Sequence, residues 1–94
     1  MDDVMTKLAD LIAQNMNDPA FVAAYAEAEV EYQVVEAMIR ARGEAGLTQG
    51  ALAARMGTTQ SAITRLEGGR VSPSVATLRK YAAAVGKRLR VEMV

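Results

Sequence analysis

The sequence contains no cysteine and no histidine. Without cysteine the chain can form neither a disulfide nor a zinc–thiolate site, and it has no thiol nucleophile. Without histidine it lacks the side chain that most often serves as general base or metal ligand. It also has no phosphate-binding glycine loop, and no pair of carboxylates with a reason to be buried. We therefore expect a protein that is not an enzyme and that holds no metal and no cofactor.

Long apolar runs are missing as well. No stretch approaches the roughly 20 consecutive apolar residues of a membrane span. The acidic start MDDVMTKLAD does not resemble a secretory signal. These features predict a cytoplasmic protein with no membrane partner.

Proline and aromatic residues are scarce: the chain has two prolines, three tyrosines and one phenylalanine. Alanine is abundant, and 51% of all residues are hydrophobic. This composition favours a helical bundle over a sheet. A length of 94 residues suits one small domain with an extension.

The formal net charge is zero, but the charges are segregated along the chain. Residues 1–46 hold nine acidic and three basic side chains, whereas residues 47–94 hold eight basic and two acidic ones. Such a division suggests two partners of opposite charge, although charges also segregate by chance in a short chain.

Apolar periodicity predicts a helix over residues 2–16 and a long helix from Pro19 to about Ala45. In the long helix, Val34, Met38, Ala41 and Ala45 form a stripe that we expect to close a core. A second stripe consists of Phe21, Tyr25, Ala28, Tyr32, Val35 and Ile39. It is either ordinary core beneath the first helix or a surface for a second subunit or another protein.

Three short helices should follow. The first begins at Thr48 and ends at Gly57; the second is capped by Thr58 or Thr59; the third is capped by Ser72 or Ser74 and closed by Gly86. The side chains expected in their core are Leu52, Ala53, Met56, Ile63, Leu66, Val75, Leu78, Ala82 and Val85.

The last residues, KRLRVEMV, alternate between apolar and charged side chains, which is the period of a strand. A single strand needs a partner for its backbone groups, and no other segment of the sequence has this period. We therefore expect the same segment of a second copy to pair with it, so that Leu89, Val91 and Met93 serve dimerisation.

Two short helices joined by a turn that contains glycine form the helix-turn-helix pattern. In that motif the first helix bridges the DNA backbone, and the second offers its N-terminal outward side chains to the major groove. The outward side chains here are Thr59, Gln60, Ser61, Thr64 and Arg65. Glutamine can pair with adenine and arginine with guanine, while serine and threonine pair with either kind of base.

The segment GLTQGALAARMGTTQSAITRLEGGRVSPSVATLRKYAAAVG resembles the helix-turn-helix domain of lambdoid repressors and Cro, the XRE family. The features that carry this resemblance are LTQ, GTTQSAI and the LE before the paired glycines, and it covers Arg40–Val85. The flanks, with DPAF before and VGKRLRVE after, are similar to HigA-type antitoxins of type II toxin–antitoxin systems.

The resemblance implies roles for individual residues. Gln49 would contact a phosphate and brace Gln60. Arg42 and Glu67 match a pair that forms a structural ion pair in relatives. Bases would be contacted by Gln60, Ser61 and Arg65, and the DNA backbone by Thr59, Arg70 and Ser72. Arg55, Arg79, Lys80, Lys87 and Arg88 lack a motif argument, so we interpret them as solvated surface.

The predicted fold is therefore all-α: a lambda-repressor-like helix-turn-helix bundle (34–86) with an N-terminal helical extension (1–33) and a C-terminal dimerisation strand (87–94). By resemblance, the protein is a homodimeric antitoxin that binds double-stranded operator DNA, represses its own operon and neutralises a basic RelE/HigB-like mRNA endonuclease. The residues expected to bind this toxin are Phe21, Tyr25, Glu29, Tyr32, Val35 and Glu36. A plain XRE-family repressor without a toxin partner, or a helical scaffold without a DNA role, are the alternatives.

Overall fold

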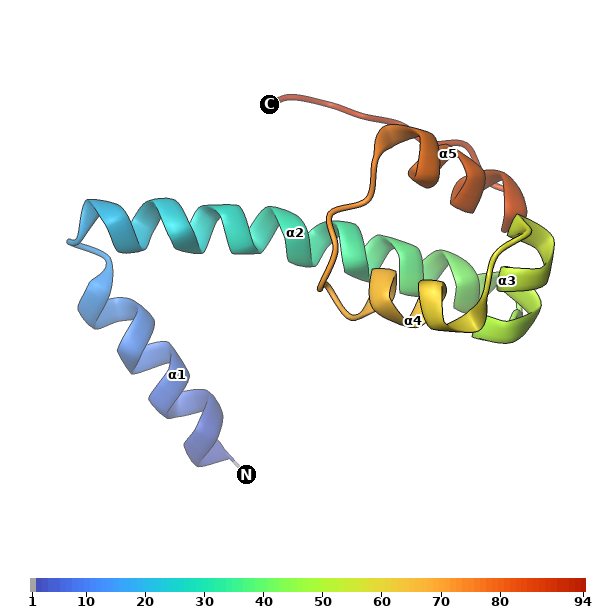
Figure 1. Cartoon of the computed structure of the whole chain (residues 1–94). Coiled ribbons are helices and arrows are strands. Elements are labelled where there is room, and N and C mark those ends of the chain that lie inside the picture. The colour runs from blue at the N-terminus through green and yellow to red at the C-terminus, as the bar shows by residue number, and fades with distance from the viewer. Residues whose placement is uncertain (1) are drawn as a thin grey trace. The chain divides into compact units, whose positions relative to one another are not determined.

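The computed structural model describes the backbone of residues 2–94 and the side chains of residues 7–94. Its five helices are α1 (Asp2–Asn15), α2 (Pro19–Glu44), α3 (Gln49–Met56), α4 (Gln60–Glu67) and α5 (Val75–Ala84), and no strand is formed among the described residues (Figure 1). The prediction of an all-α fold is confirmed. No helix in this part of the chain is both long enough and apolar enough to cross a membrane.

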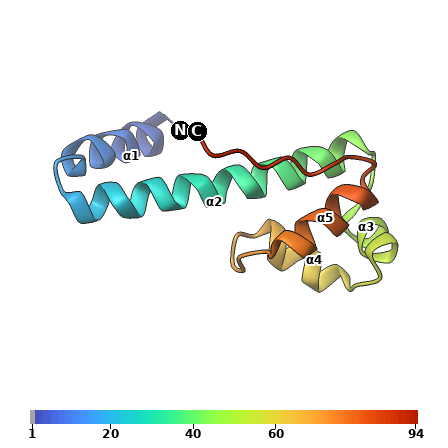
Figure 2. The same ribbon diagram turned by 90° about the horizontal axis from the view of Figure 1, so that it is seen from above.

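The chain divides into two units, one that ends at Val30 and one that comprises Glu31–Val94. The first contains α1 and the start of α2. In the second, α3, α4 and α5 gather around the C-terminal half of α2 (Figures 1 and 2). The boundary falls inside α2, which runs for 26 residues because no proline and no glycine interrupts it before Gly43.

Each short helix begins at a hydroxyl side chain. The hydroxyl oxygens of Thr48, Thr59 and Ser74 accept hydrogen bonds from the backbone N–H groups three residues later, at 3.0, 3.1 and 3.1 Å. The N-cap of α4 is thus Thr59 rather than Thr58, and that of α5 is Ser74 rather than Ser72. These bonds satisfy N–H groups that a helix leaves without an internal partner.

Among residues 7–94, whose side chains the structure describes, the buried core lies in the second unit. Leu52 and Ile63 are fully buried, and around them are packed Met38, Ala53, Leu66, Tyr81 and Val85. Two expectations for the core were wrong. Val75, the first residue of α5, is 60% exposed, and Ala45, which follows the last residue of α2, is exposed as well. Tyr81 occupies the core instead, on the same face of α5 as Leu78 and Val85.

Residues 87–94 form no regular secondary structure in the single chain, so the predicted C-terminal strand is absent from it. Leu89 is half-buried, whereas Val91 and Met93 are exposed. The alternating pattern is that of a strand, but a strand requires a neighbour for its backbone hydrogen bonds, and one copy of the chain supplies none.

Candidate nucleic-acid interface

Helices α3 and α4 pack against each other at a tight turn. Gly57 adopts a left-handed conformation, with φ at 70°, and its N–H bonds to the carbonyl of Ala54. A glycine suits this conformation because a Cβ atom would strain it. Buried side chains on both helices then hold α4 at a fixed angle to α3, and these are Leu52, Ala53, Ile63 and Leu66.

The head of α4 presents a polar face to solvent. Gln60, Ser61, Thr64 and Arg65 are all exposed and together line a shallow depression of about 380 Å³. Their amide and hydroxyl groups donate and accept hydrogen bonds, the guanidinium of Arg65 only donates, and no acidic side chain lines the depression. We call these four residues the reading face. Its composition suits the edges of DNA bases, which present donors, acceptors and methyl groups in the major groove.

Residues predicted to touch the DNA backbone lie on both sides of the reading face. Thr59 immediately precedes α4, and its hydroxyl oxygen accepts the cap hydrogen bond, which leaves its O–H available as a donor. Arg70 and Ser72 are exposed in the segment that follows α4. The side chain of Gln49 lies at the start of α3, half-buried.

The expected brace from Gln49 to Gln60 is replaced by a different contact. The amide oxygen of Gln49 accepts a hydrogen bond from the hydroxyl of Thr64 at 2.9 Å, and its amide nitrogen donates to Glu67 Oε1 at 3.1 Å. Thr64 lies one helical turn after Gln60 and therefore nearer to Glu67. Gln49 thus positions the reading face through Thr64, and the Gln60 side chain has no hydrogen bond within the described part of the chain.

Behind the reading face lies a buried polar cluster centred on Glu67, which is 8% exposed. The Nε and Nη2 atoms of Arg42 lie 2.8 Å from Glu67 Oε2 and Oε1, so the pair is bidentate. The Nη1 atom of Arg42 donates to the carbonyl of Leu47 at 3.0 Å. The pair therefore ties the end of α2 to the end of α4, and every buried side-chain polar atom in the described residues has a partner.

Tyr81 completes the cluster. Its hydroxyl lies 2.8 Å from Glu67 Oε2 and 2.8 Å from the carbonyl oxygen of Met38, so it links α5 to α4 and α2. Sequence reasoning missed this residue, although its spacing from Leu78 and Val85, three and four residues, is that of a buried helix face. The need for a polar partner at Glu67 could not be read from the spacing.

The cluster shifts the ionisation of its members. Burial raises the pKa of the Glu67 carboxyl, but hydrogen bonds from Arg42, Gln49 and Tyr81 lower it by more, so that this pKa lies below its ordinary value. Burial, and then the hydrogen bond to Glu67, raise the pKa of the Tyr81 hydroxyl well above its usual range. At neutral pH the cluster therefore contains an ionised Glu67 beside a neutral Tyr81.

The residues predicted to bind a protein partner all lie on α2. Within the first unit, Phe21 is half-buried and stacks on Tyr25, with ring centroids 6.3 Å apart, while Tyr25 is 39% exposed and Glu29 is exposed. Within the second, Tyr32 is 65% exposed, and Glu36 forms an exposed ion pair with Arg40. Val35 instead packs against the core of its unit, so less of it remains available to a partner.

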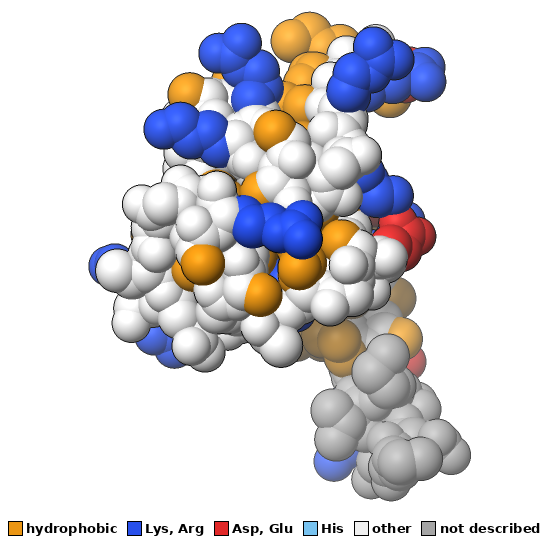
Figure 3. Space-filling model, turned by 90° about the vertical axis from the view of Figure 1, so that its right-hand side faces the viewer, with side chains coloured by type: hydrophobic (Ala, Val, Ile, Leu, Met, Phe, Trp, Pro, Cys, Tyr) orange, Lys and Arg blue, Asp and Glu red, His pale blue; other side chains and the backbone are white. Residues whose placement is uncertain are grey.

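Positive charge dominates the surface around the helix-turn-helix. Lys and Arg side chains are spread over the face shown in Figure 3, and acidic side chains appear there mainly at one edge. This distribution agrees with the excess of basic residues after residue 46. A surface of this kind attracts polyanions.

The fold and the reading face define a helix-turn-helix protein. A family model described as helix-turn-helix matches residues 38–91, and the chain belongs to this family.

Individual proteins of known sequence resemble the chain over different parts of its length. Over 90 residues, or 96% of this chain, it is 34% identical to proteins named Antitoxin HigA1 from two Mycobacterium tuberculosis strains, CDC 1551 / Oshkosh and H37Rv. The match spans 58% of the length of these relatives. Over 46 residues, 49% of this chain and 67% of the relative, it is 48% identical to an uncharacterized HTH-type transcriptional regulator from Methanothermobacter thermautotrophicus. No solved structure matches the chain significantly.

Proposed function

We propose that the chain is a sequence-specific DNA-binding protein and that α4 enters the major groove. The observation that carries this proposal is the reading face: four exposed polar or cationic side chains at the N-terminal end of a helix that the α3 turn and the Glu67 cluster hold in place. In this arrangement Gln60, Ser61, Thr64 and Arg65 contact bases, and Gln49, Thr59, Arg70 and Ser72 contact the DNA backbone.

The test is repression of the chain's own promoter fused to a reporter gene. We expect the wild-type chain to lower reporter output and Arg65→Ala to restore it, because one bidentate base contact contributes about 1–3 kcal/mol of discrimination. Gln33→Ala is a matched control, since Gln33 is exposed on α2 and belongs to no predicted contact. Repression by Arg65→Ala equal to that of the wild type would contradict the assignment of α4.

The second part of the proposal is an antitoxin role, exercised in the cytoplasm. Large apolar side chains are exposed on α1 and α2, among them Leu8, Leu11 and Tyr25 before the unit boundary and Tyr32 after it. Exposed apolar groups together with negative charge suit a basic protein partner. The similarity to HigA1 supports a toxin as that partner, and we propose an mRNA endonuclease of the RelE/HigB type.

This role predicts that the gene next to that of the chain encodes a toxic protein. Co-expression of the chain should restore growth, and Tyr25→Glu and Tyr32→Glu should abolish the rescue. Ala23→Glu is the control, because Ala23 is exposed on α2 about 200° round the helix from Phe21. A harmless neighbour, or full rescue by both tyrosine variants, would refute the antitoxin role.

The third part is a homodimer formed by residues 87–94. Val91 and Met93 expose apolar surface, and an unpaired extended segment of alternating pattern is suited to pair with its own copy. Val91→Pro removes a backbone donor and should yield monomers in sedimentation experiments. Persistence of the dimer would place the interface elsewhere. If the dimer binds one face of DNA, its half-sites lie about 34 Å apart or a multiple of that.

A plain repressor without a toxin is the second candidate. It is favoured by the 48% identity to an HTH-type transcriptional regulator, which exceeds the identity to HigA1 but covers about half of this chain. The toxicity experiment separates the two roles, since both require the reading face and only the antitoxin requires the exposed tyrosines.

A further inference from the structure

We propose that a groove between α4 and α5 holds the sugar–phosphate backbone of the DNA whose bases α4 reads, with Lys80 as a phosphate contact. The proposal rests on the DNA-binding function above. It changes the interpretation of Lys80, which the sequence pattern assigns to solvated surface.

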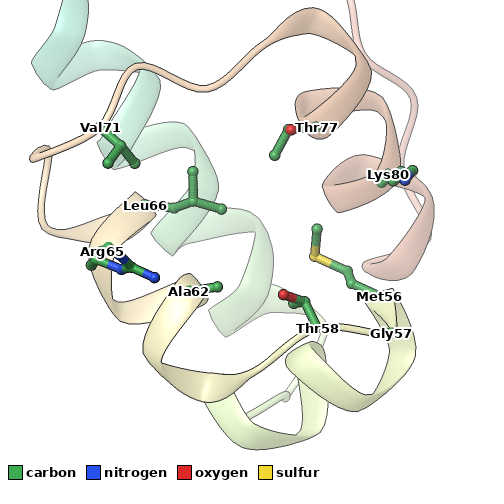
Figure 4. A pocket seen from close by; sticks show the side chains of 9 residues that line it. All are labelled: Met56, Gly57, Thr58, Ala62, Arg65, Leu66, Val71, Thr77 and Lys80. Carbon is green, nitrogen blue, oxygen red and sulfur yellow. The ribbon is translucent and has the colours of Figure 1, made fainter.

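The groove has a volume of about 490 Å³ and is lined by residues of α4, α5 and the turn between α3 and α4 (Figure 4). Apolar groups of Met56, Ala62, Leu66 and Val71 form part of its lining. Its polar and cationic lining residues are Thr58, Thr77, Arg65 and Lys80. This combination matches a strand of nucleic acid, in which apolar sugar faces alternate with anionic phosphates.

The charge of the groove favours an anion. None of its lining residues is acidic. Neither Lys80 nor Arg65 has an ion pair or a hydrogen-bond partner within the described part of the chain. By contrast, Arg42, Arg55 and Lys87 each donate to a carboxylate or carbonyl. Lys80 is therefore free to contact a phosphate, while Arg65 stays available to the bases.

The contact with Ser74 leaves the O–H of Thr77 available to donate a hydrogen bond to an anion. Its oxygen accepts a hydrogen bond from the hydroxyl of Ser74 at 3.0 Å. A threonine hydroxyl has one hydrogen to donate, and the Ser74 contact leaves it unused. Thr77 can thus donate to a phosphate oxygen that Lys80 neutralises.

Continuity with the reading face identifies the occupant. Arg65 lines both the depression of the reading face and the groove. A duplex whose bases lie against Gln60 and Arg65 must therefore carry a backbone past this side of α4. An acidic protein segment has similar charge, but nothing connects such a segment to the reading face.

The experiment compares Lys80→Ala with Arg79→Ala in the full chain. Both residues are exposed on α5, and Arg79 does not line the groove. Binding to a duplex carrying the chain's own promoter is measured by fluorescence anisotropy from 50 to 200 mM salt. Circular dichroism melts check that both variants fold as the wild type does.

The logarithm of the affinity falls as the logarithm of the salt concentration rises. If Lys80 neutralises one phosphate, Lys80→Ala makes this negative slope shallower by about 0.9. The ratio of wild-type to variant affinity then shrinks by about 3.5-fold between 50 and 200 mM salt. The loss should be equal for promoter and unrelated DNA, because a phosphate contact carries no sequence information. Arg79→Ala should keep the wild-type slope.

A wild-type slope for Lys80→Ala would overturn the groove proposal while promoter binding by the wild type stands. Lys80→Ala could instead keep the wild-type salt slope for DNA and lose only binding to the product of the neighbouring gene. That result would assign the groove to a protein partner and would also overturn the groove proposal. A wild-type chain that binds no duplex would refute the proposed function itself.

Discussion

Replacing Glu67 by glutamine should destabilise the fold more than any other single change of one polar atom. Glu67 receives hydrogen bonds from Arg42, Gln49 and Tyr81, while its side chain is 4% exposed. Glutamine preserves the shape but removes the negative charge and turns one acceptor oxygen into a donor. In either orientation that donor would face an N–H of Arg42, together with the Gln49 amide at the Oε1 position or the Tyr81 hydroxyl at the Oε2 position.

The size of the effect follows from the geometry of the pair. Removing one partner of a buried ion pair typically costs about 3–5 kcal/mol. The Arg42 side chain is 19% exposed and keeps its bond to Leu47, so water and the carbonyl compensate part of the loss. We therefore expect about 3 kcal/mol, a large share of the roughly 5–15 kcal/mol by which proteins are stable. In a domain of this size it lowers the Tm by at least about 12 °C.

The assay is urea and thermal unfolding followed by circular dichroism at neutral pH. Glu36→Gln is the control, because Glu36 and Arg40 form an exposed ion pair on α2 whose contribution is about 0.3–0.5 kcal/mol. If the free energy of unfolding of Glu67→Gln lies within about 0.5 kcal/mol of that of the wild type, the cluster does not hold α4 in place and the reasoning fails.

Three further predictions concern the same unit. Thr59→Ala should lower the free energy of unfolding by about 1 kcal/mol because it removes the N-cap of α4, and Thr58→Ala should lower it by less. Equal urea midpoints for the two variants would show that Thr59 is not the cap. Gly57→Ala should destabilise the fold by about 1–2 kcal/mol, because Gly57 has a positive φ. Gly43→Ala should stabilise it by up to about 1 kcal/mol, because Gly43 lies in a helix with open space around it. Thermal melts in which both variants shift the Tm in the same direction would contradict this. Folding lowers the pKa of Glu67. The ionised carboxylate therefore contributes its full stabilisation above the ordinary pKa of 4.5, and this stabilisation is lost as the pH falls through the lower pKa of the folded state. The stability gap between wild type and Glu67→Gln in urea melts should therefore narrow as the pH falls below 4.5, and a constant gap down to pH 2 would exclude this linkage.

Most of the fold could be predicted because its determinants are local. Proline and glycine mark the ends of α2, and Thr59 precedes the apolar positions of α4 at the spacing of an N-cap. The choice between Thr58 and Thr59 required the structure, because adjacent threonines offer the same hydroxyl. The C-terminal strand is not formed in a single chain and its pairing with a second copy stays a prediction, since alternation reports which side chains share a face and not whether a partner strand is present.

The candidate site was predictable only in part. Outward residues of α4 follow from helical period, so the reading face could be proposed from sequence, and its contact with DNA stays a prediction. The Gln49–Thr64 bond and the place of Tyr81 depend on how three helices cross, which no local pattern encodes. The groove between Arg65 and Lys80, which lie 15 residues apart in sequence, is likewise created by the way α4 and α5 pack on α3.

The most direct test of the central claim is selection of duplex DNA from a random library by the wild-type chain, followed by measurement of affinity for the selected and a scrambled site. A helix-turn-helix that reads bases should prefer the selected site at least about 10³-fold at physiological salt. Gln60→Ala should relax the preference at one base position by about 1–3 kcal/mol. Failure to enrich any sequence, or a Gln60→Ala variant with the complete wild-type preference, would contradict the claim that α4 reads DNA.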